Sequence, residues 1–382
     1  MSKHDRNKQL IDNFIKEAQE KHAQLISGKK TPIMGWCSTY VPEEILMAAG
    51  FLPYRVMGAP VSLSLSKSYL AGNLCPSIQS ILECALKGDY GFLDGIVIGG
   101  MTDATKRLYD AWKQYGNTPF CHIFHIPKLI NDAAIWHYKE SIFLLIEYLQ
   151  DHFKIKINDS DIADAISVCN KTRQLLTDLN DLRRDENPPI SSQQMLEVSR
   201  LAMISDKKIY NIALEALLKK ITLDSSPNPG FRVLLTGSFQ DQSWFLDIIE
   251  STGAKVVCED MCTRLRYFSG LVDDNTDLID SISKRYINSK PPSASLVSLE
   301  QRSKHILKLI DEFNVDAVIY YIIKFDDPYL FEFPDMKEIL VSHDIPVLRI
   351  ETEHNTNAMG QVSTRIEAFI ETLKHFKPVR VN

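Results

Sequence analysis

Residues 32–51 read PIMGWCSTYVPEEILMAAGF, and this stretch decides how the first part of the chain folds. Its apolar run, residues 33–36, is typical of a short buried strand. The residues after it lead to Pro42, which suits the first position of a helix because proline lacks a backbone N–H. Cys37 is therefore expected in a loop between a strand and a helix, at the edge of a parallel sheet where ligands bind. From this stretch alone, a thiol packed in the core is an equally good interpretation.

The polar residues near Pro42 each have two interpretations. Glu43 and Glu44 lie in the first turn of the expected helix, where the helix dipole favours negative charge. They could contact a substrate, but glutamates in contact with solvent are the expected state at a helix start. Ser38 could contact a substrate oxygen, and a hydrogen bond at the entry of the helix is an equally good interpretation.

The composition bounds the class of protein. The chain has 382 residues, of which 45% are hydrophobic, so it is long enough for two domains with a full core. Its formal net charge of −6 argues against nucleic acid as the main partner, because phosphate binding favours a basic surface. No leader-like segment and no apolar run of membrane-spanning length stands out, so a cytoplasmic protein without a membrane partner is expected. The seven cysteines are then thiols, core residues or metal ligands rather than disulfides.

A second cysteine lies in the same local setting as Cys37. The stretch GNLCPS, residues 72–77, places Cys75 directly before Pro76 and an apolar helical pattern. Backbone N–H groups at a helix start lower the pKa of a thiol, so Cys75 is expected to favour the thiolate. Cys84 lies within the same helix among apolar residues, and core packing is the better interpretation there.

Strands and helices alternate in two parts of the chain, and a helical block lies between them. This pattern predicts an α/β fold with two doubly wound parallel-sheet domains of the Rossmann or flavodoxin-like kind. The first domain is expected over residues 1–132, the helical connector over 133–225 and the second domain over 226–382. A linker containing Pro and Gly, residues 224–230, marks the second boundary. Glu351, at the end of the last expected strand, is a candidate catalytic residue.

Several stretches share the order and spacing of a known family. They include GWCSTYVPEEILMAAGFLP (35–53), GNLCPS (72–77), VVCEDMCTRLRYF (256–268) and IKFDDPYLFEFPDMK (323–337). Over nearly its whole length, the chain resembles the family of 2-hydroxyacyl-CoA dehydratase component D and benzoyl-CoA reductase subunits.

The resemblance implies a subunit of an oxygen-sensitive lyase that acts on an acyl-CoA substrate. Such a subunit binds a [4Fe-4S] cluster in the cleft between its two α/β domains and pairs with a homologous second subunit, as a heterodimer or a homodimer. A separate ATP-dependent activator protein injects an electron, and the acyl-CoA thioester undergoes radical dehydration or reduction. On this resemblance, Cys37 and Cys75 match the first two cluster ligands, and thiolates are the soft ligands that suit iron–sulfur clusters.

The chain departs from the family pattern at the third ligand. A family cysteine in a K-F-C-D-P stretch is replaced by Asp326, and a further family cysteine is replaced by Thr102. Either Asp326 ligates iron through its carboxylate, or the chain has lost its cluster and is the non-redox structural partner of a cluster-bearing subunit. A third interpretation is a double-cubane-type reductase of small molecules. Cys262 matches a position used in those relatives, but other cysteines that they need are absent, as at residues 291–294.

Overall fold

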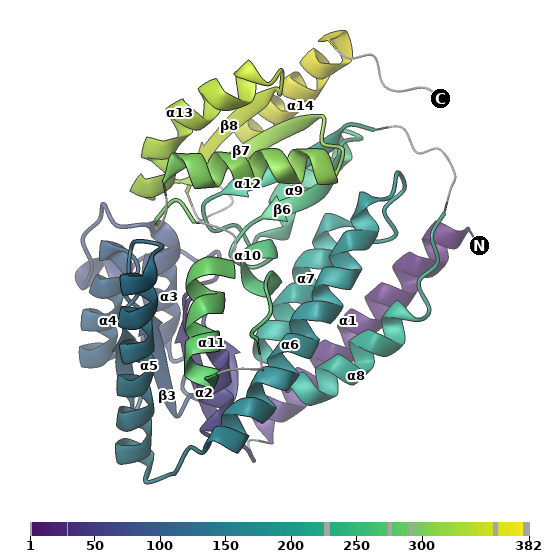
Figure 1. Cartoon of the computed structure of the whole chain (residues 1–382). Coiled ribbons are helices and arrows are strands. Elements are labelled where there is room, and N and C mark those ends of the chain that lie inside the picture. Colours follow the sequence, from purple (N-terminus) through teal and green to yellow (C-terminus); the bar gives the residue numbers. More distant parts are fainter. Residues whose placement is uncertain are drawn as a thin grey trace.

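The computed structural model describes residues 2–28, 30–224, 230–273, 277–289, 293–295, 298–353 and 358–376 (Figure 1). Two four-stranded sheets, in which all strands are parallel, lie in separate halves of the molecule, and a layer of long helices lies beside them. This arrangement confirms the predicted α/β class with two parallel sheets. Residues 225–229 of the predicted linker lie outside the described part of the chain, and the two boundaries between the three predicted parts stay predictions.

The first sheet contains the strand that the sequence predicts before Cys37. Its strand order is β2-β1-β3-β4, and every neighbouring pair is parallel. Helices α2, α3 and α4 connect consecutive strands, so the carboxyl ends of the strands all meet at one edge of the sheet. The bounds are β1 Ile33–Cys37, α2 Glu43–Ala48, β2 Leu52–Arg55, η1 Ser66–Ser68, α3 Pro76–Lys87, β3 Gly95–Gly99, α4 Asp103–Tyr115 and β4 Cys121–Phe124.

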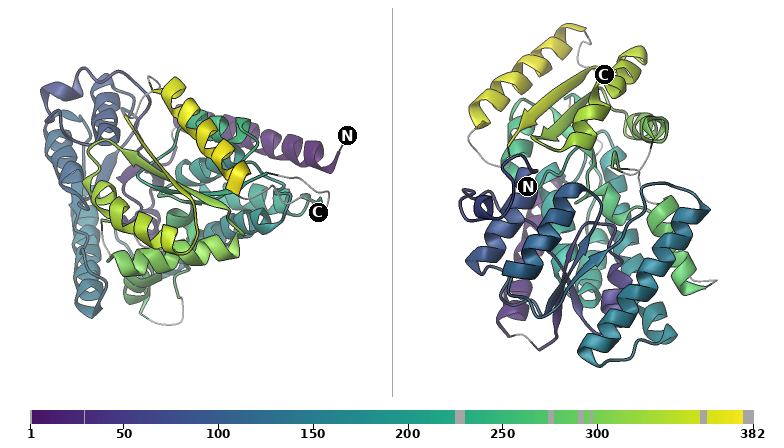
Figure 2. Two further views of the ribbon diagram at one scale, coloured as in Figure 1. Left: turned by 90° about the horizontal axis from the view of Figure 1, so that it is seen from above. Right: turned by 90° about the vertical axis from the view of Figure 1, so that its left-hand side faces the viewer.

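The second sheet repeats this topology, with the strand order β6-β5-β7-β8 and parallel pairing throughout. Figure 2 shows this sheet with α13 and α14 at the end of the molecule away from the first sheet. The motif at residues 323–337 ends β7 and forms the first turns of α13. The bounds are β5 Arg232–Gly237, α9 Ser243–Ser251, β6 Lys255–Asp260, α10 Leu265–Phe268, α11 Leu278–Lys284, η3 Arg285–Ser289, α12 Leu299–Glu312, β7 Ala317–Ile323, α13 Asp327–Ser342, β8 Val347–Thr352 and α14 Met359–Phe376.

The helical block predicted between the sheets is present, and the first helix of the chain joins it. Helix α1 packs against α7 and α8, and α6 packs against α2 and α8. Within the described ranges, no helix is both long and apolar enough to cross a membrane. The bounds are α1 Lys3–Ser27, α5 Asp132–Phe153, α6 Asp159–Asp181, η2 Leu182–Arg184, α7 Ser192–Ile204 and α8 Lys207–Leu218.

Two buried ion pairs attach the first sheet to this helical layer, and they show that the expectation of solvated glutamates at 43 and 44 is wrong. Glu44 is fully buried, and its Oε1 lies 2.5 Å from Nη2 of Arg173 on α6. Glu43 is also buried, and its Oε1 lies 3.0 Å from Nζ of Lys207 at the start of α8. The helix-dipole rule explains why acidic residues begin α2, but it carries no information about cations that lie far away in the chain.

Candidate functional site

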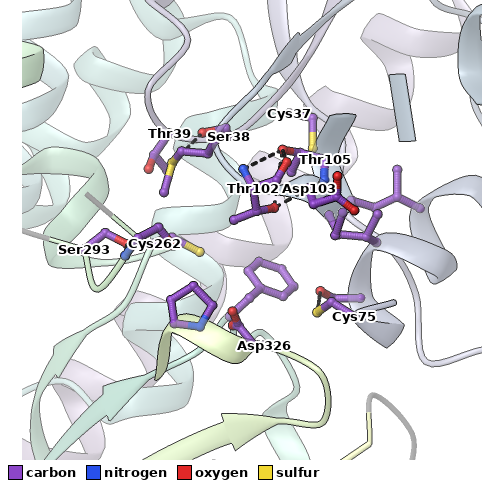
Figure 3. Close-up of a pocket in the computed structure, with 18 of the residues that line it drawn as sticks. Cys37, Ser38, Thr39, Cys75, Thr102, Asp103, Thr105, Cys262, Ser293 and Asp326 are labelled. Atoms are coloured by element: carbon purple, nitrogen blue, oxygen red, sulfur yellow. Dashed lines mark hydrogen bonds between the residues drawn. The ribbon is translucent and has the colours of Figure 1, made fainter. Parts of the chain in front are cut away.

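A cavity of about 410 Å³ lies where the carboxyl ends of the two sheets face each other. The loops after β1, β2 and β3 form one side, and the loops after β5, β6 and β7 form the other. Parallel α/β sheets bind ligands at this edge, and here two such edges share one cavity. Figure 3 shows that Cys37, Cys75, Cys262 and Asp326 surround it.

Two strained backbone positions lie at this cavity, one on each side. Ser38 directly follows Cys37 and has a φ of 92°, and Phe325 directly precedes Asp326 and has a φ of 64°. Residues other than glycine rarely adopt such left-handed angles, and strain of this kind concentrates at functional sites. On each side of the cavity, the strained residue is the neighbour of a predicted cluster ligand.

The first sheet contributes two buried thiols to the cavity. Cys37 is the last residue of β1, and Cys75 is the N-cap of α3, so the strand–loop–helix setting predicted for both cysteines is confirmed. Sγ of Cys75 lies 3.1 Å from Oγ of Ser77 in the first turn of α3. Cys84 is buried within the same helix and does not line the cavity, as its interpretation as a core residue predicted.

Burial controls the protonation of these thiols. Burial and the nearby Asp326 carboxylate raise the pKa of Cys75 to about 12, against the opposing effect of the Ser77 hydroxyl. Burial also raises the pKa of Cys37. The expectation that the helix start makes Cys75 a thiolate is therefore wrong for the free protein, because desolvation of the charged form outweighs the helix dipole. A metal ion deprotonates a thiol that it coordinates, so the raised pKa does not prevent metal binding.

The second sheet contributes an oxygen donor and a third thiol. Asp326 is the N-cap of α13, and burial raises the pKa of its carboxyl group to about 6. Asp326 lies close enough to Cys75 for its charge to raise the pKa of that thiol. Cys262, in the loop after β6, lines the same cavity, and its charge acts on the pKa of Cys37. Sulfur therefore reaches the cavity from both sheets.

The cavity brings together four of the five predicted site residues. These are Cys37, Ser38, Cys75 and Asp326. Glu351 is not among the lining residues; it lies on β8 at the edge of the second sheet, where it pairs with Arg349. The Ser38 hydroxyl accepts a hydrogen bond from the backbone N–H of Tyr40 at 3.3 Å, which is the helix-entry bond named as one of its two interpretations.

A buried ionic cluster supports the second wall of the cavity. The Asp260 carboxylate, at the end of β6, lies 2.7 Å from Nη2 of Arg266 and 3.1 Å from Nη1 of Arg302. Burial alone would raise the pKa of Asp260, but the two guanidinium groups hold it well below its ordinary value. Arg302 also lies 2.8 Å from Glu332 of α13. Since Arg266 lines the cavity, this cluster fixes part of the wall.

Arg55 is a lining residue that the sequence reasoning missed. It is the last residue of β2, it is buried, and it lies near Cys37 and Cys262, whose pKa values its positive charge lowers against the effect of burial. The signal was available in its position. A charged residue at the end of an apolar strand, in the same sheet as Cys37, is expected at the same edge of the sheet as Cys37.

A single metal ion and an iron–sulfur cluster need different arrangements of donor atoms. Across the described residues, no group of three or more His, Cys, Asp or Glu side chains could hold one metal ion. A cluster has different requirements, because its protein ligands bind separate iron atoms and need not converge on one point. Three thiols and a carboxyl group distributed around a cavity of about 410 Å³ fit a cluster better than a single ion.

Comparison with known proteins gives one family and several relatives of similar length. Residues 38–373 match the family described as 2-hydroxyglutaryl-CoA dehydratase, D-component. The (R)-phenyllactyl-CoA dehydratase beta subunit of Clostridium sporogenes is 28% identical over 96% of this chain and 97% of its own length. The (R)-2-hydroxyglutaryl-CoA dehydratase beta subunit of Acidaminococcus fermentans is 27% identical over 95% of this chain and 99% of its own length. One of the benzoyl-CoA reductase subunits of Thauera aromatica is 23% identical over 90% of this chain and 91% of its own length.

All three relatives are named as subunits of enzymes, two of them dehydratases and one a reductase. This agrees with the family predicted from the motifs around Cys37, Cys75 and Asp326. The family match extends from the loop after β1 into α14 and so includes both sheets. The chain therefore belongs to the 2-hydroxyglutaryl-CoA dehydratase D-component family.

Proposed function

We propose that the chain is a subunit of a 2-hydroxyacyl-CoA dehydratase-type enzyme and that it holds a [4Fe-4S] cluster between its two sheets. One observation carries the proposal. The buried thiols of Cys37 and Cys75 line one cavity, and the Asp326 carboxyl group lines it from the second sheet, where the family has a third cysteine. The relatives named as dehydratase beta subunits support the class of reaction.

The proposed ligands differ in how firmly they hold iron. The thiolates of Cys37, at the end of β1, and Cys75, at the N-cap of α3, are soft donors. Asp326 is a harder oxygen donor, and its pKa of about 6 leaves much of it ionised at neutral pH and able to bind a cation. Asp326 would therefore hold a bound cluster less firmly than the two thiolates, and a cluster bound here would supply a Lewis acid for a substrate oxygen.

The chemistry proposed for the site is a one-electron reaction of an acyl-CoA. When bound, the cluster would supply an electron to the thioester carbonyl, so that the hydroxyl group of the acyl chain is expelled or the acyl group is reduced. The chain's own residues hold the reacting groups in a cavity whose wall includes buried apolar side chains, such as Val56 and Ile81, and this limits access of water. Ser38 lines the cavity beside Cys37, where we propose that its hydroxyl faces a substrate oxygen.

The proposed assembly has two further proteins. The relatives are named as subunits of larger enzymes, which supports a homologous second subunit for this chain. An ATP-dependent activator would deliver the electron. A cytoplasmic location belongs to the same proposal.

A second candidate function is favoured by Asp326 itself. A carboxylate in place of a thiolate weakens the hold on iron, so the chain could be a partner subunit without a cluster of its own. The two functions differ in a quantity that is measured directly. A cluster-bearing chain contains iron and acid-labile sulfide after anaerobic purification, and the silent partner contains neither although it is folded.

Cys37→Ser tests the proposed function. The variant is expected to fold and to lose most of its iron and sulfide, because a serine hydroxyl replaces a soft thiolate ligand. The measurement is iron and sulfide per chain after anaerobic reconstitution, with circular dichroism to confirm folding. Cys84→Ser is the matched control, since this buried cysteine lies on α3 outside the cavity, and its iron content is expected to equal that of the wild type. Equal iron in wild type and Cys37→Ser would contradict the proposal.

A further inference from the structure

Arg55 has an unusual environment for a buried arginine. It is 6% exposed, and its guanidinium carbon lies 4.6 Å from the ring centroid of Trp36, its neighbour on β1. Its Nε and Nη1 atoms are buried and have no hydrogen-bond partner among the described residues. A buried charge without a partner is strongly unfavourable, so such a residue needs an explanation.

Other buried arginines of this chain have a polar partner on at least one guanidinium nitrogen, although two nitrogen atoms of Arg264 also lack one among the described residues. Each of three arginines on α6, η2 and α12 has a glutamate within ion-pair distance. The pairs are Arg173–Glu44, Arg183–Glu259 and Arg302–Glu332. Within the described part of the chain, no carboxylate forms such a pair with Arg55. The missing anion is therefore not supplied by a nearby acidic residue.

The groups that Arg55 does face are thiols. Arg55 lines the cavity together with Cys37 and Cys262, and its charge lowers the pKa of both against the effect of burial. Cys37 comes from the first sheet and Cys262 from the second, so the guanidinium group lies near sulfur from both walls. A thiolate, or an anion bound between these two sulfurs, is what would satisfy its free N–H groups.

We propose that Arg55 is the counter-cation of the anionic group that fills this cavity, and that it acts on that group beside the sulfur atoms of Cys37 and Cys262. The inference rests on the proposed function in one respect: there, the anionic group is the iron–sulfur cluster with its cysteine thiolates. Positive charge and hydrogen bonds directed at cluster sulfur stabilise the reduced state, so Arg55 would raise the reduction potential and slow the loss of iron.

Arg55→Met tests this inference, because methionine keeps much of the packing on Trp36 and removes the charge. After anaerobic reconstitution, the variant is expected to have a more negative reduction potential in an EPR-monitored titration. It is also expected to lose iron to a chelator about tenfold faster than the wild type. Arg55→Lys restores the charge without the planar group and is expected to be intermediate. A potential and a rate of iron loss equal to those of the wild type would overturn the inference.

Arg285→Met is the matched control. Arg285 is equally buried, but it donates to the backbone carbonyl oxygens of Tyr267, Ser269 and Gly270 and does not line the cavity. Its variant is expected to be less stable and to keep the wild-type potential. A potential that shifts as much in Arg285→Met as in Arg55→Met would also overturn the inference, because the effect would not be specific to the cavity.

If the chain binds no cluster, a different measurement tests the role of Arg55. If the wild type takes up no iron, the cluster is absent and the stability of the apoprotein decides the question of Arg55. A counter-cation without its anion destabilises the empty protein, so Arg55→Met is expected to melt at a higher temperature than the wild type. A lower melting temperature would overturn the inference, since Arg55 would then be a structural residue. Arg55→Gln serves in the same measurements if the methionine variant does not fold.

Discussion

The two sheets have the same strand order, but their matching outer strands end in opposite charges with opposite surroundings. Strand β2 ends at Arg55, and β6, which has the same place in the second sheet, ends at Asp260. Two arginines lie within ion-pair distance of Asp260, whereas the buried Nε and Nη1 atoms of Arg55 have no partner in the described part of the chain. The charge of Asp260 is neutralised within the fold, whereas the charge of Arg55 faces the cavity.

The ends of the matching inner strands β1 and β5 also differ. Strand β1 ends in Cys37, whereas the matching strand β5 ends in Gly237, where a Cβ atom would overlap the carbonyl oxygen of Tyr321. The first position is free to carry a reactive side chain, and the second is restricted to glycine by close backbone packing. At matching strand ends, the residues of the second sheet, Asp260 and Gly237, are fixed by packing within the fold. Those of the first sheet, Arg55 and Cys37, face the cavity and are available to a ligand.

The largest loss of stability is expected when the paired carboxylate of Asp260 is removed. Asp260→Asn leaves Arg266 and Arg302 without their shared carboxylate in a buried site, and breaking such a pair costs about 3–5 kcal/mol of unfolding free energy. Chemical denaturation of the apoprotein measures this loss. The exposed pair of Glu300 and Lys304 provides the control, because Glu300→Gln is expected to be nearly neutral. A loss below about 1 kcal/mol of unfolding free energy for Asp260→Asn would mean that Asp260 is not a structural residue, and its difference from Arg55 would then disappear.

Much of the fold followed from local patterns, for identifiable reasons. The strand that ends at Cys37 and the helix that begins after Cys75 were predicted, because hydrophobic runs and proline at a helix start depend only on neighbouring residues. The same positions placed four candidate residues at one cavity, since parallel strands bring their carboxyl ends together. Glu351 lies near the end of β8, which is at the opposite edge of the sheet from β6, and strand position alone does not indicate which strand ends reach the cavity.

What the sequence did not reveal depends on contacts between distant segments. The burial of Glu44 requires Arg173 of α6, and the charge state of Asp260 requires Arg302 of α12. No local pattern relates these residues, because the pairs form only when the sheets and helices have packed. The raised pKa of Cys75 has the same origin: the helix start was predicted correctly, but the desolvation that outweighs it is a property of the assembled cavity.

A smaller loss of stability is expected from Glu44→Gln, which removes a buried, paired carboxylate on α2 beside the first sheet. Glu44 accepts a hydrogen bond from Tyr286 at 3.0 Å and pairs with Arg173, and the guanidinium groups of Arg173 and Arg285 hold its pKa below the ordinary value although burial opposes this. Glu44→Gln leaves one guanidinium group without its carboxylate, whereas Asp260→Asn leaves two, so a smaller loss of about 1.5–3 kcal/mol of unfolding free energy is expected.

The control for Glu44→Gln is Glu215→Gln, which removes an exposed pair with Lys171 in the same helical layer and is expected to be nearly neutral in urea denaturation. If both variants had the same stability, the attachment of α2 to α6 would not depend on the buried charge. The iron content of Glu44→Gln is expected to equal that of the wild type, because Glu44 does not line the cavity.

The smallest effect concerns the oxygen donor of the second sheet and depends on pH. Burial raises the pKa of Asp326 to about 6 in the folded apoprotein, above its ordinary value of 3.8. Below the ordinary value, the carboxyl group is neutral in both the folded and the unfolded state and carries no penalty. Between the ordinary value and about 6, the unfolded state ionises while the folded state stays protonated, so the wild type loses stability as the pH rises over this window and loses no more above it. Asp326→Asn removes the decline, and after allowance for solvent screening the difference at pH 7 is about 1–2 kcal/mol.

Unfolding free energies of the apoprotein at about pH 4 and about pH 7 measure this difference between Asp326→Asn and the wild type. Asp335→Asn, an exposed position on the same helix, is the control and is expected to keep the wild-type dependence on pH. A decline of the same size in Asp326→Asn would mean that the carboxyl group is well solvated in the free protein. The second sheet would then offer the cavity an ordinary surface acid, and the contrast with the buried, unpaired Arg55 on the first sheet would become larger.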